Sequence, residues 1–411
     1  MPVKCNKTVL DNGISLIVEE NKNLPIVSLL FIFKGGSVFE NIKNQGITNL
    51  LLKAMLKGTK HNDFSMLSDR IEELGAVLEH FTARDFCGFK LNLVSHCLKM
   101  GFGILKEIIQ TAELDHQEIE KEKKIIISEI KKRRDNTYAR AVDLCESALF
   151  LPDAYGFSVF GCENSLKNIS RDDLIYWKYK LFSSSDILLS VSGDTNIQEI
   201  KSLAETIYVN NKKNGLKCDN LISDKKRIIK KNEYICKKQA VVAIGYKTSK
   251  IKSKDFAGLE VLNNVLSGMG SRLFIRVRDD LGLAYTISSV YHAYFRSGSF
   301  MIYFGTSHEK YSKAIDVIFK ELEILKKNVI DTDELKRSIN YLLGTRHIDM
   351  QKNASRAFKY AVYELSGYGW QTAYNIENKF KNVSIKEIKR VAEKYFDLKN
   401  CVIAKILPEK K

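Results

Sequence analysis

The sequence lacks any run of about eighteen apolar residues, the minimum for a membrane-spanning helix, although 45% of its 411 residues are hydrophobic. A chain of this length and composition can bury two ordinary cores. The first residues show no apolar stretch typical of a signal peptide and lead directly into a turn at Asn12-Gly13. From the sequence we therefore expect a cytoplasmic protein that does not span a membrane.

Metal-binding and disulfide patterns are also missing. The eight cysteines include no C-x-x-C pair, which argues against a zinc ribbon or a disulfide framework. The seven histidines include no two that stand four residues apart. Each histidine is therefore interpreted as a surface or packed side chain, and no metal ligand set is expected in this chain.

The formal net charge is +16, which raises the question of a nucleic-acid partner. Two basic clusters, at residues 131–134 and 225–231, have no interleaved aromatic residues and no nucleic-acid motif beside them. Clusters of this kind are usually solvated faces of helices and loops. We expect no nucleic-acid partner.

Apolar periodicity indicates alternating groups of strands and helices that occur twice along the chain. Strands are expected at residues 7–20, 26–34, 76–82, 86–94, 187–191, 234–246, 283–294, 299–305 and 401–406, and a long helical stretch at 116–149. Residues 168–182 resemble residues 382–396, and 114–119 resemble 330–335, at nearly the same separation. Two matches at one spacing indicate a duplication.

These patterns predict an α+β fold made of two duplicated halves, each a mostly antiparallel sheet packed with helices. The first half is expected at residues 1–209 and the second at 233–411. Residues 210–232, rich in Asn, Lys, Asp and Ser, are interpreted as a linker.

Residues 46–59 read as one mostly buried helix that ends at Gly58. Asn49, Leu52 and Lys53 stand at i, i+3 and i+4 and therefore share one helical face. A zinc peptidase places two His ligands and a Glu base at this spacing. Here the three positions carry an amide, an alkyl group and an ammonium, none of which can do that work.

The same segment resembles the inverted zinc motif of the insulinase/pitrilysin family, in its bacterial and mitochondrial-processing-peptidase branch, where members read G-[IL]-A-H-F-L-E-H-M-L-F-K-G-T. The matching positions are Gly46, Ile47, Leu51, Lys57, Gly58 and Thr59. Without gaps, the family's first His falls on Asn49, its Glu on Leu52 and its second His on Lys53. The resemblance covers the whole chain and implies the duplicated α+β architecture, but a zinc motif that has lost its ligands.

Residues 121–130 resemble the family's second motif, E-x-x-x-V-[IV]-x-x-E-I. By this resemblance Glu129 falls on the remaining zinc ligand and Glu122 on an accessory carboxylate. Two glutamates alone cannot hold zinc, because such sites need three or four protein ligands. Either both are solvated helix residues, or the Lys53 ammonium pairs with Glu129, since a buried carboxylate needs a partner.

Residues 266–286 closely resemble a long family block, [GS]-G-M-x-S-R-L-F-x-x-V-R-x-x-x-G-L-A-Y-[ST], which places its Arg and Tyr on Arg278 and Tyr285. In the family this pair reaches the active site, where the Arg holds the substrate backbone and the Tyr donates a hydrogen bond near the substrate carbonyl. The alternative is a purely structural pair, with Asp279 or Asp280 neutralising Arg278. Residues 73–85 resemble the family segment whose strand receives the peptide as an added strand.

The resemblance therefore implies a non-catalytic subunit of a heterodimeric zinc peptidase that processes or degrades peptides. A homologous partner with an intact His-x-x-Glu-His motif would bring the zinc, while this chain lends Arg278 and Tyr285 and could form a homodimer in the partner's absence. The second reading is an inert scaffold of the same fold in a larger complex. The third is an autonomous metallopeptidase with a rebuilt site.

Overall fold

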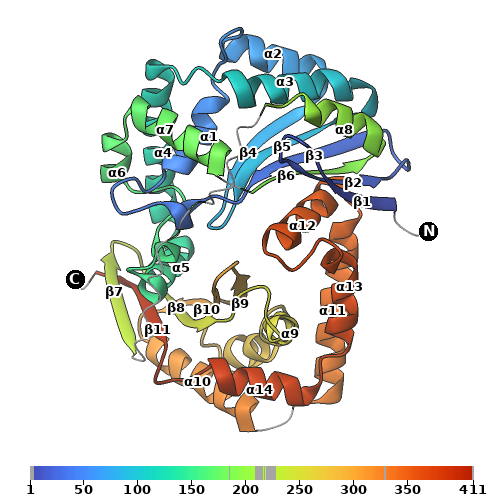
Figure 1. Cartoon of the computed structure of the whole chain (residues 1–411). Coiled ribbons are helices and arrows are strands. Elements are labelled where there is room, and N and C mark those ends of the chain that lie inside the picture. Colours follow the sequence, from blue (N-terminus) through green and yellow to red (C-terminus); the bar gives the residue numbers. More distant parts are fainter. Residues whose placement is uncertain are drawn as a thin grey trace. The chain divides into compact units, whose positions relative to one another are not determined.

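Two separate β-sheets, each packed with helices, organise the chain (Figure 1). The computed structural model describes residues 4–184, 186–208, 216, 218, 228–327 and 330–409. Its contacts divide the chain into two compact units, which are described one at a time. Unit 1 comprises Met1–Ile130, Phe157–Asn220 and Asp349–Ala373; unit 2 comprises Lys131–Gly156, Leu221–Ile348 and Tyr374–Lys411. The expected α+β class is confirmed.

The sheet of unit 1 has six strands in the order β1-β2-β6-β3-β5-β4. Their bounds are β1 Lys4–Val9, β2 Ser15–Glu20, β3 Ile26–Phe33, β4 Val77–Thr82, β5 Cys87–Val94 and β6 Ile187–Gly193. Only the β2–β6 pair is parallel; the other neighbours are antiparallel, as the sequence predicted. Strand β4 lies at one edge and pairs with β5 alone among the described strands.

Helices cover both faces of this sheet, which explains why β3 is apolar except at Ser28. The helices of unit 1 are α1 Ile47–Met55, α2 Phe64–Glu73, α3 Leu98–Thr111, α6 Glu163–Asn168, α7 Arg171–Ser184, α8 Ile197–Glu205 and α12 Asn353–Leu365, together with most of α4 His116–Asp135. Phe31 and Phe33 belong to the core shared with α1, α3 and α7. Because side chains alternate along a strand, Leu30 and Ile32 point to the other face, where α12 packs on β3 and β6.

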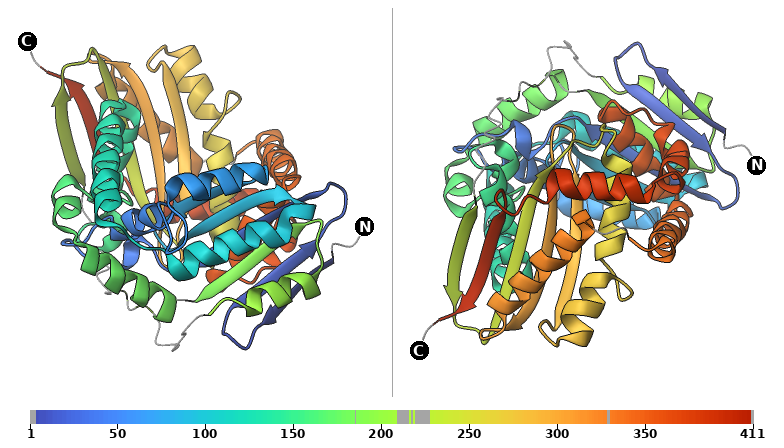
Figure 2. Two further views of the ribbon diagram at one scale, coloured as in Figure 1. Left: turned by 90° about the horizontal axis from the view of Figure 1, so that it is seen from above. Right: turned by 90° about the horizontal axis from the view of Figure 1, so that it is seen from below.

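The sheet of unit 2 has five strands in the order β7-β11-β8-β10-β9. Their bounds are β7 Ile229–Ile235, β8 Gln239–Thr248, β9 Thr286–Ala293, β10 Gly298–Ser307 and β11 Val402–Pro408. The last strand of the chain, β11, inserts between β7 and β8, parallel to the first and antiparallel to the second (Figure 2). The helices of unit 2 are α5 Thr137–Phe150, α9 Phe256–Leu266, α10 Tyr311–Lys327, α11 Thr332–Met350, α13 Thr372–Lys381 and α14 Ile385–Tyr395.

Each unit contains one helix from the other half of the sequence. Helix α12 is fixed to the first sheet by Arg356, whose Nε lies 2.7 Å from Glu19 Oε2, with both side chains buried. Helix α5 is fixed to the second sheet by the buried Glu146, which accepts hydrogen bonds from Tyr294 and Ser299. A Cβ at Gly245 of β8 would lie 2.5 Å from Cys145 Sγ, so the absence of a side chain there lets α5 approach the sheet. The two predicted halves were contiguous, whereas the compact units exchange these two helices.

Three predicted elements are corrected. The helix expected over 46–59 with its end at Gly58 is α1, which ends at Met55, and Gly58 forms an isolated β-bridge with Asp63. The helical stretch expected over 116–149 is broken at Asn136, whose side chain caps α5 by accepting from the backbone of Tyr138 and Ala139. The strand expected at 234–246 is two strands, and β7 already begins at Ile229, inside the expected linker. Of that linker, only residues 216, 218 and 228–232 belong to the described residues. In the described part of the chain, no helix has the length and apolar character needed to cross a membrane.

Candidate functional site

Helix α1 is held rigidly at its N-terminus. Gly46 precedes it with φ 87°, and a Cβ there would lie 2.6 Å from the carbonyl oxygen of Phe160, so only glycine fits. The buried Glu40 carboxylate accepts hydrogen bonds from the backbone N–H of Gly46 at 2.7 Å and of Thr48 at 3.0 Å. Burial raises the pKa of Glu40 to about 7, while these hydrogen bonds oppose the rise. Trp177 Nε1 donates to Thr48 Oγ1 at 3.0 Å and ties α1 to α7.

Asn49 and Leu52 face the buried side of α1, with exposures of 4% and 0%. The Asn49 Nδ2 group has no hydrogen-bond partner among the described residues. Leu52 offers no donor or acceptor and packs in the core with its neighbours Leu50 and Leu51.

Lys53 and Lys57 each meet a glutamate of α4. Lys53 Nζ lies 2.7 Å from Glu129 Oε1, so the ion pair expected from the sequence is present. Two residues past the end of α1, Lys57 Nζ lies 3.1 Å from Glu122 Oε1 and 4.2 Å from the ring centre of Phe64. The Glu122 side chain is only 5% exposed, whereas that of Glu129 is 41% exposed. Glu122 and Glu129 are therefore not simply solvated helix residues.

His80 of β4 lies close enough to this group to feel its charges. Burial, followed by the positive charge of Lys53, lowers the pKa of His80 to about 4, while Glu129 acts in the opposite direction. The imidazole is therefore uncharged at neutral pH. From the sequence, His80 was interpreted as one more surface or packed histidine. A single histidine in the predicted strand at residues 76–82 gives no sign of the charges near it, so the sequence offered no signal that could have singled it out.

Arg278 and Tyr285 lie in unit 2. Unlike Lys53 and Lys57, both are exposed at the surface. Residues Phe274–Asp280 form a π-helix, and the Arg278 guanidinium lies 4.4 Å from the ring centre of Phe274. Asp280 pairs with Arg276, at 3.3 Å, and not with Arg278.

Tyr285 stands just before β9, with its side chain 62% exposed and its backbone N–H bonded to Gly305. Among the described residues, neither the Arg278 guanidinium nor the Tyr285 hydroxyl has a hydrogen-bond partner. Among the described residues, neither Asp279 nor Asp280 forms an ion pair with Arg278, and the guanidinium rests on the ring of Phe274.

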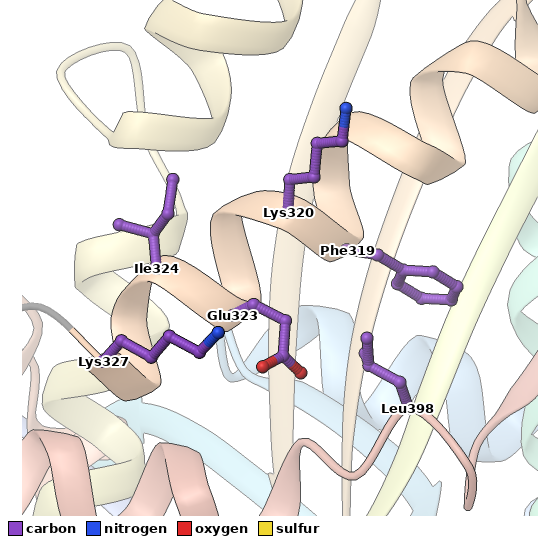
Figure 3. A pocket seen from close by; sticks show the side chains of 6 residues that line it. All are labelled: Phe319, Lys320, Glu323, Ile324, Lys327 and Leu398. Carbon is purple, nitrogen blue, oxygen red and sulfur yellow. The ribbon is translucent and has the colours of Figure 1, made fainter.

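Unit 2 also has a shallow hollow of about 440 Å³ along α10 (Figure 3). Its lining is formed by Phe319, Lys320, Glu323, Ile324, Lys327 and Leu398. Its one carboxylate, Glu323, accepts from Lys326 at 2.6 Å. This hollow has no nucleophile or acid–base pair in its lining, and we assign no chemistry to it.

Two family descriptions match successive parts of the sequence. Residues 16–161 match the model of the insulinase family, peptidase family M16, and residues 168–342 match that of the peptidase M16 inactive domain. The chain belongs to the insulinase family. An uncharacterized zinc protease of Bacillus subtilis is 25% identical over 94% of both chains. The mitochondrial-processing peptidase subunit beta of Rattus norvegicus is 29% identical over 48% of this chain and 40% of that protein.

The fold agrees with this membership. The crystal structure of a peptidase M16 inactive domain from Pseudomonas fluorescens superposes with a TM-score of 0.90 over 99% of both chains, at 18% sequence identity. At that identity the likeness concerns the fold alone.

Zinc does not fit the residues that insulinase-family resemblance places at its ligand positions. Asn49 and Lys53 stand at the two His positions and supply no ligand of the kind zinc prefers, and Leu52 cannot act as the base. The third ligand position, Glu129, is paired with the Lys53 ammonium. Across the described residues, no group of three or more His, Cys, Asp or Glu side chains is arranged to hold a metal ion.

Proposed function

We propose that this chain is the non-catalytic subunit of a heterodimeric zinc peptidase. Its partner is a homologous chain with an intact His-x-x-Glu-His motif, and its substrate is a peptide. Arg278 positions the peptide backbone and Tyr285 donates a hydrogen bond near the reacting carbonyl of the substrate in the partner's zinc site.

The proposal is supported by a contrast between two groups of side chains: Lys53 and Glu129 are paired with each other, whereas Arg278 and Tyr285 have no hydrogen-bond partner among the described residues. Lys53 forms an ion pair with Glu129, the glutamate at the remaining zinc-ligand position, so this chain has no hydrolytic centre at α1. Arg278 and Tyr285, by comparison, are exposed and bound to no described hydrogen-bond partner. Side chains of this kind can serve a substrate held by another chain. One of the relatives is itself described as a subunit of a peptidase.

Mixing this chain with a partner that carries the intact motif tests the proposal. We expect peptide hydrolysis that neither chain shows alone. Arg278→Ala should lower kcat/KM of the mixture by about 100-fold, the usual effect of removing one donor to the transition state. The matched control is Arg276→Ala, because Arg276 is exposed on the same π-helix but pairs with Asp280. An unchanged rate with Arg278→Ala would contradict the shared site.

An inert scaffold of the same fold is the second candidate. It is favoured by the α1 region, where Lys53 and Lys57 satisfy both glutamates without any ligand. A scaffold role predicts a stable complex with proteins that are not peptidases, and no peptide hydrolysis with any partner. Isolating the native complex and assaying it for peptide hydrolysis distinguishes the two functions.

A further inference from the structure

A hollow of about 310 Å³ lies in unit 1, between the end of α3 and helix α7. Ile109, Ile175 and Phe182 give it an apolar lining. Tyr179 and Tyr208 also line it and are 54% and 76% exposed. Its volume is at the lower end of the range for small-ligand sites in proteins, which begins at about 300 Å³.

One lysine forms part of this apolar lining. Lys178 Nζ lies 5.9 Å from the ring centre of Phe182. Burial, followed by the positive charge of the nearby Lys60, lowers the pKa of Lys178 to about 8. Among the described residues, no carboxylate pairs with either lysine. Other enclosed lysines of unit 1 differ in this respect, since Lys53 and Lys57 each have a glutamate partner.

We propose that this hollow binds a small amphipathic carboxylate, with its apolar body against Ile109, Ile175 and Phe182 and its carboxylate facing Lys178. Lys178 is a half-buried cation with no carboxylate partner among the described residues, and a bound carboxylate would offset the cost of that burial. The apolar lining favours an anion that carries a hydrocarbon body over a strongly hydrated ion such as phosphate. The inference does not rest on the peptidase function, because Lys178 belongs to neither group of residues described above.

Calorimetric titration of the full chain with octanoate tests the proposal. We expect one octanoate per chain, at least tenfold weaker binding of the uncharged octanamide, and no comparable binding of inorganic phosphate. Lys178→Met should reduce octanoate affinity at least tenfold, while Lys178→Arg, which keeps the charge, should stay within about threefold of the native affinity. Lys180→Met is the matched control, because Lys180 lies on the same helix but over the rings of Tyr176 and Trp177.

A second measurement covers the case in which Lys178→Met fails to fold. After reductive ¹³C-methylation of the native chain, octanoate should raise the pKa of Lys178 measured by NMR. Acetyl-Leu-Phe and its amide test whether the natural carboxylate is the C-terminus of an apolar peptide. If acetyl-Leu-Phe binds more tightly than both its amide and octanoate, a peptide C-terminus is the natural ligand. Equal affinity for octanoate and octanamide, or phosphate binding as tight as octanoate binding, would overturn the proposal.

Discussion

The cations at and just after helix α1 and the arginine Arg278 of the π-helix at Phe274–Asp280 have opposite surroundings. Lys53 and Lys57 are partly buried and each is paired with a glutamate of α4. Arg278 is exposed and rests on the face of Phe274. The first arrangement is complete without a ligand, so its charges serve the fold. The second leaves donors available to a bound molecule, so its loss should be felt in function and not in stability.

The largest effect on stability is expected from Lys57→Met. Glu122 is 5% exposed, so the substitution leaves a buried carboxylate without its cation. Removing one member of a buried pair typically costs about 3 kcal/mol of unfolding free energy, which urea denaturation measures. The double variant Lys57→Met/Glu122→Met should recover most of this loss. A loss from the single variant as small as that of a surface substitution would show that water reaches Glu122.

The next effect is a dependence of stability on pH that comes from His80. The pKa is about 4 in the folded chain, and about 6.5 is usual for an unfolded one, so the unfolded chain binds the proton more readily. Stability is therefore fully present above pH 6.5 and is lost as the pH falls towards 4. Comparing the native chain with His80→Gln by urea denaturation at pH 7 and pH 5 should show about 2 kcal/mol of additional acid loss in the native chain. Parallel pH profiles would contradict the low pKa.

Lys53→Met should have a smaller effect than Lys57→Met, although its ion pair is shorter. Glu129 is 41% exposed and can regain water when the ammonium is removed. We expect a loss of about 1 kcal/mol. Lys90→Met is the matched control, because its pair with Glu79 joins strands β5 and β4 of the same unit and is more exposed on the lysine side, at 36% compared with 13%. A loss equal to that of the control would mean that the Lys53–Glu129 pair contributes nothing specific.

The smallest effects are expected from Arg278→Ala and Tyr285→Phe. Both side chains are exposed and have no described hydrogen-bond partner, so each substitution should change the free energy of unfolding by less than about 0.5 kcal/mol. Thermal unfolding of the isolated chain checks this. A clear destabilisation would contradict this expectation and would show that Arg278 and Tyr285 stabilise the fold.

The sequence allowed the two sheets and the Lys53–Glu129 pair to be predicted, because both depend on local periodicity and on motif spacing. The packing of α5 on the second sheet and of α12 on the first could not be predicted. An amphipathic pattern shows that a helix buries one face, but it does not show which sheet that face covers. The break at Asn136 was missed because one capping residue inside a long helical pattern is a weak signal. His80 was missed because a lone histidine says nothing about the charges that the fold brings near it. The functional roles of Arg278 and Tyr285 stay predictions.

The position of α12 in the sequence has a consequence for synthesis on the ribosome. The strands of the first sheet are all made by Gly193, but the helix that covers Leu30 and Ile32 ends at Leu365. Until that point the growing chain carries a bare apolar sheet face, the kind of surface that chaperones bind and that aggregates when left uncovered. A stop codon anywhere between these two positions would therefore yield an insoluble fragment, not a smaller working domain.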